Sequence, residues 1–159
     1  MKSLIVYYSQ TGNTAGTAII LSNILKEKGE VKILSLEVKS EIPSFFKKCR
    51  SAFFRKRVQI NEVPTDISSY DLFCIGSPVW ALHPVPAINT YLDQIEGVAG
   101  KEAIAFVTYG SGLGKGKALK CMKNSLLNKG VSRVKTFSVS QFHSKDSDYI
   151  RKILKDLGI

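Results

Sequence analysis

Hydroxyl and amide side chains are concentrated in one short turn near the start of the chain. The turn follows the apolar run 4–8, opens a helical pattern, and consists of Ser9, Gln10, Thr11, Gly12, Asn13 and Thr14. The free N–H groups of a helix's first turn and the positive end of its dipole attract anions. Hydroxyl side chains add donors, and glycine lets the backbone close around a phosphate. Since the turn holds no lysine or arginine, it would bind a phosphate through neutral donors.

The turn by itself does not identify a ligand. It lacks the Gly-Lys-Ser/Thr ending of a Walker loop and the spaced glycines of a dinucleotide fingerprint. An ordinary strand-to-helix turn capped by serine or threonine would have the same composition. The choice between a phosphate site and a simple helix cap therefore depends on the rest of the chain.

Two later loops carry aromatic and glycine-rich sequences. The loop 77–86 follows the apolar run 72–75 and Gly76, and it contains three prolines and the only tryptophan of the chain, Trp80. The loop 109–116 follows the apolar run 103–108 and contains four glycines. The first loop predicts a stiff aromatic wall. The second predicts backbone N–H groups that can reach the edge of a flat ring.

The periodicity of apolar residues predicts the elements that position these loops. Short apolar runs indicate strands at 3–8, 31–36, 72–75, 103–108 and 131–139, and helical stripes occur within 15–28, 45–57, 85–95, 119–126 and 150–157. This alternation predicts an α/β fold: a doubly wound, five-stranded parallel sheet of order 2-1-3-4-5 with helices on both faces. Ligands bind such sheets beyond the carboxyl ends of the strands. All three unusual loops are therefore expected at one edge.

The composition is that of a single globular domain. Its 159 residues, 44% hydrophobic and 23% charged, predict a single domain spanning 1–159 with a full core. The three cysteines have no metal-ligand spacing, so no metal site is predicted, and reduced thiols indicate a cytoplasmic protein. Only Met1, Lys2 and Ser3 precede the first apolar run, and no apolar run approaches the ~18 residues of a membrane span, so neither a signal peptide nor a span is expected.

The net charge of +10 is the unusual property of this sequence. A positive field attracts acidic proteins, nucleic acid or anionic substrates. Six basic residues fall in the segment 45–57, where Phe46, Cys49 and Phe53 share one helical face. This segment is interpreted as a crossover helix whose basic residues face solvent. A docking face for an acidic partner or for a membrane surface is the alternative. Nucleic-acid binding is not predicted, because the basic residues are spread over several helices without a recognition motif.

Taken together, the three loops resemble those of the flavodoxin-like proteins, which bind FMN. The resemblance covers essentially the whole chain and implies that residues 9–14 bind the FMN phosphate. It implies contact with the flavin ring for the second loop, namely Ser77, Pro78, Val79, Trp80 and Ala81. It implies that the pyrimidine end of the ring lies near the third loop, namely Thr108, Tyr109, Gly110, Ser111 and Gly112.

The same resemblance implies electron transfer through bound FMN to or from a redox partner protein. A small FMN-dependent NAD(P)H oxidoreductase of the quinone or flavin reductase type is an alternative, because Lys115 and Lys117 beside the third loop could steer a phosphate-bearing nicotinamide. A non-redox module that binds a phosphate ligand or a partner is another. No catalytic residue is assigned, since the flavin itself carries the redox chemistry. Related families include dimers that share a flavin site, so the oligomeric state is left open.

Overall fold

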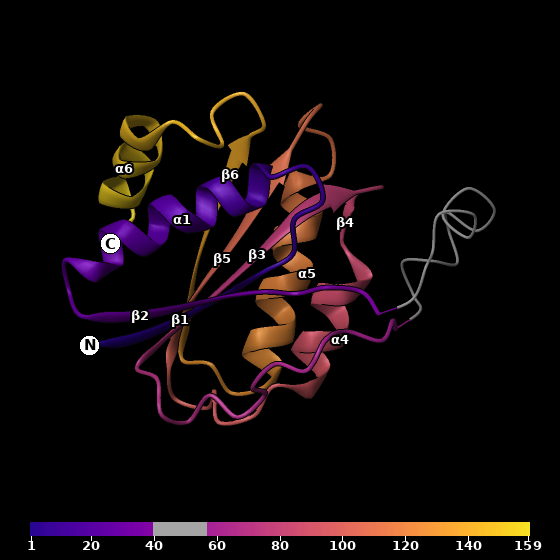
Figure 1. Cartoon of the computed structure of the whole chain (residues 1–159), viewed down its shortest axis with the longest axis vertical. Coiled ribbons are helices and arrows are strands. Elements are labelled where there is room, and N and C mark those ends of the chain that lie inside the picture. Colours follow the sequence, from indigo (N-terminus) through magenta and orange to yellow (C-terminus); the bar gives the residue numbers. More distant parts are fainter. Residues whose placement is uncertain (40–56) are drawn as a thin grey trace.

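The computed structural model describes residues 1–39 and 57–159, which form a twisted parallel sheet between two layers of helices (Figure 1). The five long strands are β1 (Lys2–Tyr7), β2 (Glu30–Ser35), β3 (Leu72–Trp80), β5 (Glu102–Tyr109) and β6 (Arg133–Ser140). They pair in the order β2-β1-β3-β5-β6, and every pair along this path is parallel. This confirms the predicted order 2-1-3-4-5, since β5 and β6 are the fourth and fifth long strands.

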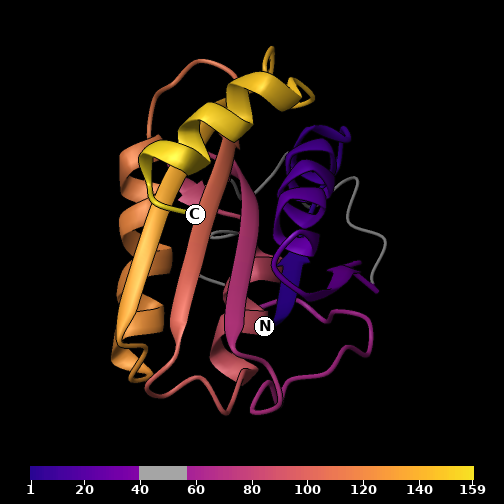
Figure 2. The ribbon, with the colours of Figure 1, turned by 90° about the vertical axis from the view of Figure 1, so that its left-hand side faces the viewer.

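Among the described elements, two helices cover each face of the sheet (Figure 2). On one face, α1 (Asn13–Lys26) and α6 (Ser147–Asp156) bury the predicted stripes that contain Leu21 and Leu154. On the other face, α4 (Pro86–Gln94) and α5 (Lys115–Asn128) bury Ile88 and Met122. The apolar periodicity of the sequence therefore identifies the inward face of each of these four helices.

The connection from β2 to β3 is described only at its two ends, residues 36–39 and 57–71. The helix predicted over 45–57 lies outside the described residues except for Arg57. The chain that follows is extended: the N–H of Lys39 donates to the carbonyl of Gln59 at 2.9 Å, and the N–H of Asn61 donates to that of Glu37 at 3.0 Å. These two bonds, with the bridge between Val38 and Ile60, make an antiparallel contact.

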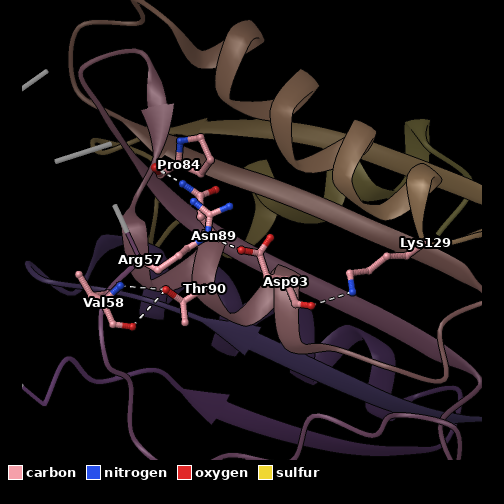
Figure 3. A network of polar contacts seen from close by, with 7 residues as sticks. All are labelled: Arg57, Val58, Pro84, Asn89, Thr90, Asp93 and Lys129. Atoms are coloured by element: carbon pink, nitrogen blue, oxygen red, sulfur yellow. Dashed lines mark hydrogen bonds and ion pairs between the residues drawn. The ribbon is translucent and has the colours of Figure 1, made fainter. Parts of the chain in front are cut away.

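This extended segment is fastened to α4 by polar contacts (Figure 3). The Thr90 hydroxyl lies 3.1 Å from both the N–H and the carbonyl of Val58, and Arg57 pairs with Asp93. The Tyr91 hydroxyl donates to the carbonyl of Pro64 at 2.8 Å. Burial is the main cause that raises the pKa of Tyr91, so it remains a neutral donor. The segment thus covers the part of the sheet next to β2 without helical structure of its own.

The predicted loop 77–86 is wrong in its first half, which continues as strand. Ser77 and Pro78 stay in register with Val107 and Thr108 of β5. Beyond that point, β3 pairs with the short antiparallel strand β4 (His83–Pro84). The turn between them has positive φ at both central residues, Ala81 (43°) and Leu82 (72°). Such a two-residue turn suits the right-handed twist of a hairpin, so the aromatic wall belongs to a hairpin rather than to a free loop.

A glycine in the middle of β3 allows an aromatic side chain to lie across the sheet. A Cβ atom on Gly76 would lie 2.2 Å from Cζ of Phe106. The Phe106 ring is fully buried and stacks on Phe137 at a centroid distance of 5.3 Å, so it has no room to move aside. Close packing here depends on the absence of a side chain at position 76.

We expect Gly76→Ala to lower the free energy of unfolding by about 1–3 kcal/mol, because the added methyl group overpacks the core against Phe106. Urea denaturation of the purified protein measures this change. Gly116→Ala is the matched control, since a Cβ there meets no atom within 4 Å. The control should leave stability unchanged or raise it by up to ~1 kcal/mol, because alanine favours helix. Equal stability of the two variants would contradict the packing argument.

Candidate functional site

The loops singled out in the sequence meet at the carboxyl edge of the sheet, at the upper end of Figure 2. They enclose a cavity of about 140 Å³. Its lining comprises Thr11, Asn13, Pro78, Val79, Trp80, Thr108, Tyr109, Gly110 and Gln141. Eight of these nine residues belong to the set predicted from sequence. Gln141, from the loop after β6, was not predicted.

The turn 9–14 leaves the start of α1 open to a ligand. Gly12 is the N-cap residue and has a left-handed conformation with φ of +83°. No side chain caps the helix. The simpler interpretation of this turn, a serine or threonine cap, is therefore wrong for α1. The N–H groups of its first turn and the positive end of its dipole face the site, which favours an anion there.

The hydroxyl of Ser9 is the most informative single atom of the site. It is buried, and it has no hydrogen-bond partner among the residues that the structure describes. A buried hydroxyl that lacks a partner costs about 1–3 kcal/mol. A phosphate oxygen bound in the turn would remove that cost, since it accepts a hydrogen bond from the hydroxyl.

A network from the loop after β6 holds the turn in place. The Asn13 amide donates to Oγ1 of Thr11 at 3.2 Å, and the buried Ser144 hydroxyl lies 3.0 Å from Oδ1 of Asn13. The carbonyl of Ser144 in turn accepts from the Thr17 hydroxyl at 3.1 Å. A Cβ on Gly16 would lie 3.0 Å from this carbonyl, so the small residue permits the approach. Sequence analysis missed Ser144, and only the small residues 16 and 17 on α1 could have suggested a close neighbour.

A second buried contact joins the turn to β5. The hydroxyls of Thr14 and Thr108 lie 2.7 Å apart. Both residues were predicted to contact the ligand, and the structure shows that they also bind each other. This bond fixes the distance between the first turn of α1 and the end of β5.

Aromatic residues form the walls of the cavity. Trp80 is half-buried and meets Tyr8 edge to face, with ring centroids 5.8 Å apart. Burial raises the pKa of Tyr8, which keeps its hydroxyl neutral. Tyr109, which also lines the cavity, carries the Lys115 ammonium 4.6 Å from its ring centroid. The cavity therefore combines two aromatic rings with polar lining residues such as Thr11 and Gln141, and the Lys115 ammonium lies against one of these rings.

The other predicted site residues lie around the cavity without lining it. The Ser77 hydroxyl is used within the hairpin, where it accepts from the N–H of Val85 at 3.1 Å and donates to the carbonyl of Pro78 at 2.8 Å. Ala81 and Ser111 are exposed at loop tips. The remaining residues of this group are Ser9, Gln10, Gly12, Thr14 and Gly112, each within two positions of a lining residue in the sequence.

Two findings on residues 1–39 and 57–159 bear on the class of protein. No group of three histidine, cysteine or acidic side chains in this part of the chain could hold a metal ion. Over the same ranges, none of the helices has the length and apolar character needed to cross a membrane.

A doubly wound sheet with an uncapped helix N-terminus and an aromatic wall at the switch point is the arrangement of mononucleotide-binding α/β proteins. A sequence model of the flavodoxin family matches residues 2–152. The chain therefore belongs to the flavodoxin family. A comparison with curated proteins gave no match.

Solved structures of flavoproteins share this fold. A candidate flavoprotein of Bacteroides uniformis has a TM-score of 0.74 at 20% identity, with 97% of each chain covered. A flavoprotein of Lactobacillus acidophilus in complex with FMN has a TM-score of 0.61 at 24% identity, covering 85% of this chain and 92% of its own. An NADH:FMN oxidoreductase in its apo form has a TM-score of 0.64 at 18% identity, and the match covers 98% of this chain and 86% of the oxidoreductase chain.

We expect Ser9→Ala to weaken FMN binding roughly 10- to 100-fold, because a hydrogen bond to a charged group contributes about 1.5–3 kcal/mol. The stability of the FMN-free protein should stay the same or rise, since the variant removes a buried hydroxyl without a partner. Quenching of FMN fluorescence measures the first effect and urea denaturation the second.

Ser3→Ala is the matched control for this variant. The Ser3 hydroxyl is likewise buried without a partner among the described residues, but it lies at the opposite end of β1. Its removal should not change FMN affinity. An unchanged affinity in Ser9→Ala, or an equal loss in both variants, would show that the Ser9 hydroxyl has no ligand role.

We also expect Ser144→Ala to weaken FMN binding about tenfold, since Asn13 loses the bond that orients its amide. Isothermal calorimetry measures the affinity. Ser132→Ala serves as control, because its hydroxyl donates to the carbonyl of Lys101 at 2.9 Å, in loops at the far edge of the sheet. Identical affinities of the two variants would rule out a positioning role for Ser144.

Proposed function

We propose that this protein binds FMN and transfers electrons through it. The observation that carries the proposal is the buried Ser9 hydroxyl, which lacks a partner among the described residues and lies in the turn before an uncapped helix. A phosphate needs several convergent donors, and this turn supplies hydroxyls, an amide and backbone N–H groups. The aromatic cavity beside it suits a flat ring attached to that phosphate.

Different residues of the site would bind different parts of FMN. Ser9, Thr11 and the first turn of α1 would bind the phosphate, while Thr14 keeps this turn against β5. Trp80 and Tyr109 would lie along the isoalloxazine and exclude water from it. FMN, when bound, supplies one- and two-electron redox chemistry. No protein side chain is assigned a proton-transfer role.

The small cavity favours a carrier over an enzyme with its own second substrate. At about 140 Å³ it is below the usual range of small-molecule sites, about 300–1,000 Å³. Part of the cofactor would therefore face solvent, where a partner protein could reach it. The Lys115 ammonium lies 3.4 Å from the Tyr109 hydroxyl, so this cation already has a partner within the protein.

An FMN-dependent NAD(P)H oxidoreductase is the second candidate. It is supported by the lysines beside the third loop and by the similar fold of an NADH:FMN oxidoreductase. The net charge of +10 would affect the reduction potential of FMN in the same way for a carrier and for an oxidoreductase. Fully reduced FMN is anionic, and positive surroundings stabilise an anion. Its full reduction should therefore need a less negative potential than in an acidic relative.

The absorbance spectrum of the protein after incubation with FMN and gel filtration tests the proposal. We expect flavin bands at about one FMN per chain. A colourless protein would contradict FMN binding and favour a module for another phosphate ligand.

We further expect no steady oxidation of NADH or NADPH by the FMN-loaded protein with a quinone or free flavin as acceptor, because a cavity of about 140 Å³ is too small to hold a nicotinamide beside the flavin. Loss of absorbance at 340 nm measures this activity. Sustained turnover would replace the carrier with the oxidoreductase. A Lys117→Ala variant that then raised KM more for NADPH than for NADH would locate the nicotinamide phosphate.

A further inference from the structure

Helix α5 presents a row of lysines without counter-charges. Lys117, Lys120 and Lys123 are exposed and recur every third residue, so they lie toward one side of the helix. The helix contains no aspartate or glutamate. None of the three lysines joins an ion pair with any residue in the described part of the chain. The positive charge of this row is therefore directed at solvent.

Elsewhere on the described surface, four basic side chains form ion pairs, whereas others, such as Lys28, Lys32 and Lys152, form none with the described residues. Arg133 pairs with Glu102 at 3.5 Å, and Arg151 pairs with Glu27 at 3.1 Å. The α5 row differs in that three neighbouring lysines, spaced three residues apart on one helix, all lack such partners among the described residues. The three ammonium groups repel one another, and no carboxylate among the described residues offsets this repulsion. The carboxylates of an acidic partner would do so.

Exposed apolar side chains lie at the end of α5 where this row begins. Leu113, just before α5, is 73% exposed, and Leu82, in the hairpin turn, is 43% exposed. The two belong to one surface, because a Cβ on Gly114 would lie 2.4 Å from Cα of Leu82. The Cys121 thiol and the His83 ring, 4.0 Å apart, make a second contact between α5 and the hairpin. We call Leu82, Leu113, Lys117, Lys120 and Lys123 the α5 face.

The α5 face borders the cofactor cavity. Its hairpin carries Trp80, and the loop that leads to α5 begins after Tyr109, and both of these residues line the cavity. A protein seated on the α5 face would therefore lie next to the exposed edge of a flavin in that cavity. Apolar contact at the centre with charged residues around it is the usual composition of a protein interface.

We propose that the α5 face docks an acidic electron-transfer protein, whose carboxylates pair with the lysine row and whose apolar surface covers the two leucines. The inference rests on the proposed function and adds the partner's charge and the place where it binds. Complementary charge would raise the rate of encounter and orient the partner toward the flavin.

Each productive encounter transfers one electron. With a reduced iron–sulfur protein as the donor, the cluster is oxidised by one electron and bound FMN is reduced by one. Full reduction of FMN takes two encounters, and the accompanying protons come from solvent. No bond forms between the two proteins.

Stopped-flow mixing of the FMN-loaded protein with a reduced plant-type [2Fe–2S] ferredoxin tests the proposal, because this probe is acidic and has a low potential. We expect a second-order rate constant that falls as ionic strength rises. The triple variant Lys117→Glu, Lys120→Glu, Lys123→Glu should lower it at least about 30-fold at low salt. Leu113→Ala should lower the affinity about 3- to 10-fold without changing the salt dependence.

The matched control carries the same change of charge elsewhere: Lys28→Glu, Lys32→Glu, Lys152→Glu, all at exposed positions off the α5 face. It should alter the rate less than about threefold. A second-order rate constant that does not change with ionic strength, or one that falls equally in the control and test variants, would overturn the proposal. Tighter binding of a short RNA duplex than of ferredoxin, abolished by the α5 substitutions, would also overturn it by assigning the face to nucleic acid.

Failure of this proposal can be separated from failure of FMN binding. Oxidised ferredoxin can be titrated into the isotope-labelled, FMN-free protein and followed by NMR. Shifts confined to α5 and the 81–82 turn support docking even if no flavin binds. Normal flavin loading without such shifts, and with a rate that the α5 variant leaves unchanged, would remove the docking face and keep the proposed function.

Discussion

A single buried bond between two hydroxyls determines the shape of the site. Thr14, in the first turn of α1, and Thr108, at the end of β5, lie 2.7 Å apart although 94 residues separate them in sequence. The bond sets the start of α1 against the strand end whose loop forms another wall of the cavity. Ser144 adds a second restraint through Asn13. The uncapped N–H groups of α1 are thereby held at a fixed place, which is what a preformed anion site requires.

Much of the fold follows from local patterns in the sequence. Buried strands appear as short apolar runs, and the inward faces of α1, α4, α5 and α6 appear as helical stripes, so the order of the sheet could be predicted. The hairpin at 79–84 could not, because Ala81 and Leu82 adopt positive φ, which neither residue type favours. Ser144 was missed for another reason: its bond to Asn13 spans 131 residues and leaves no local signal.

The net positive charge is a second feature on which the proposed function depends. The net charge of +10 is a property of the whole sequence. In the structure, three of the lysines are grouped on α5 and lack counter-charges among the described residues. Binding of the cofactor and choice of partner would then depend on different parts of the molecule. Neutral donors would hold the phosphate, while the lysines would act at longer range on a protein.

The comparison of FMN with riboflavin as ligands tests the central claim most directly, because the two differ only in the phosphate. Both can be titrated by quenching of flavin fluorescence under the same conditions. At least two hydrogen bonds to a charged phosphate predict that FMN binds at least about 100-fold more tightly than riboflavin. Equal affinity of the two flavins would show that the turn 9–14 is not a phosphate site, and the account of the cofactor given above would be wrong.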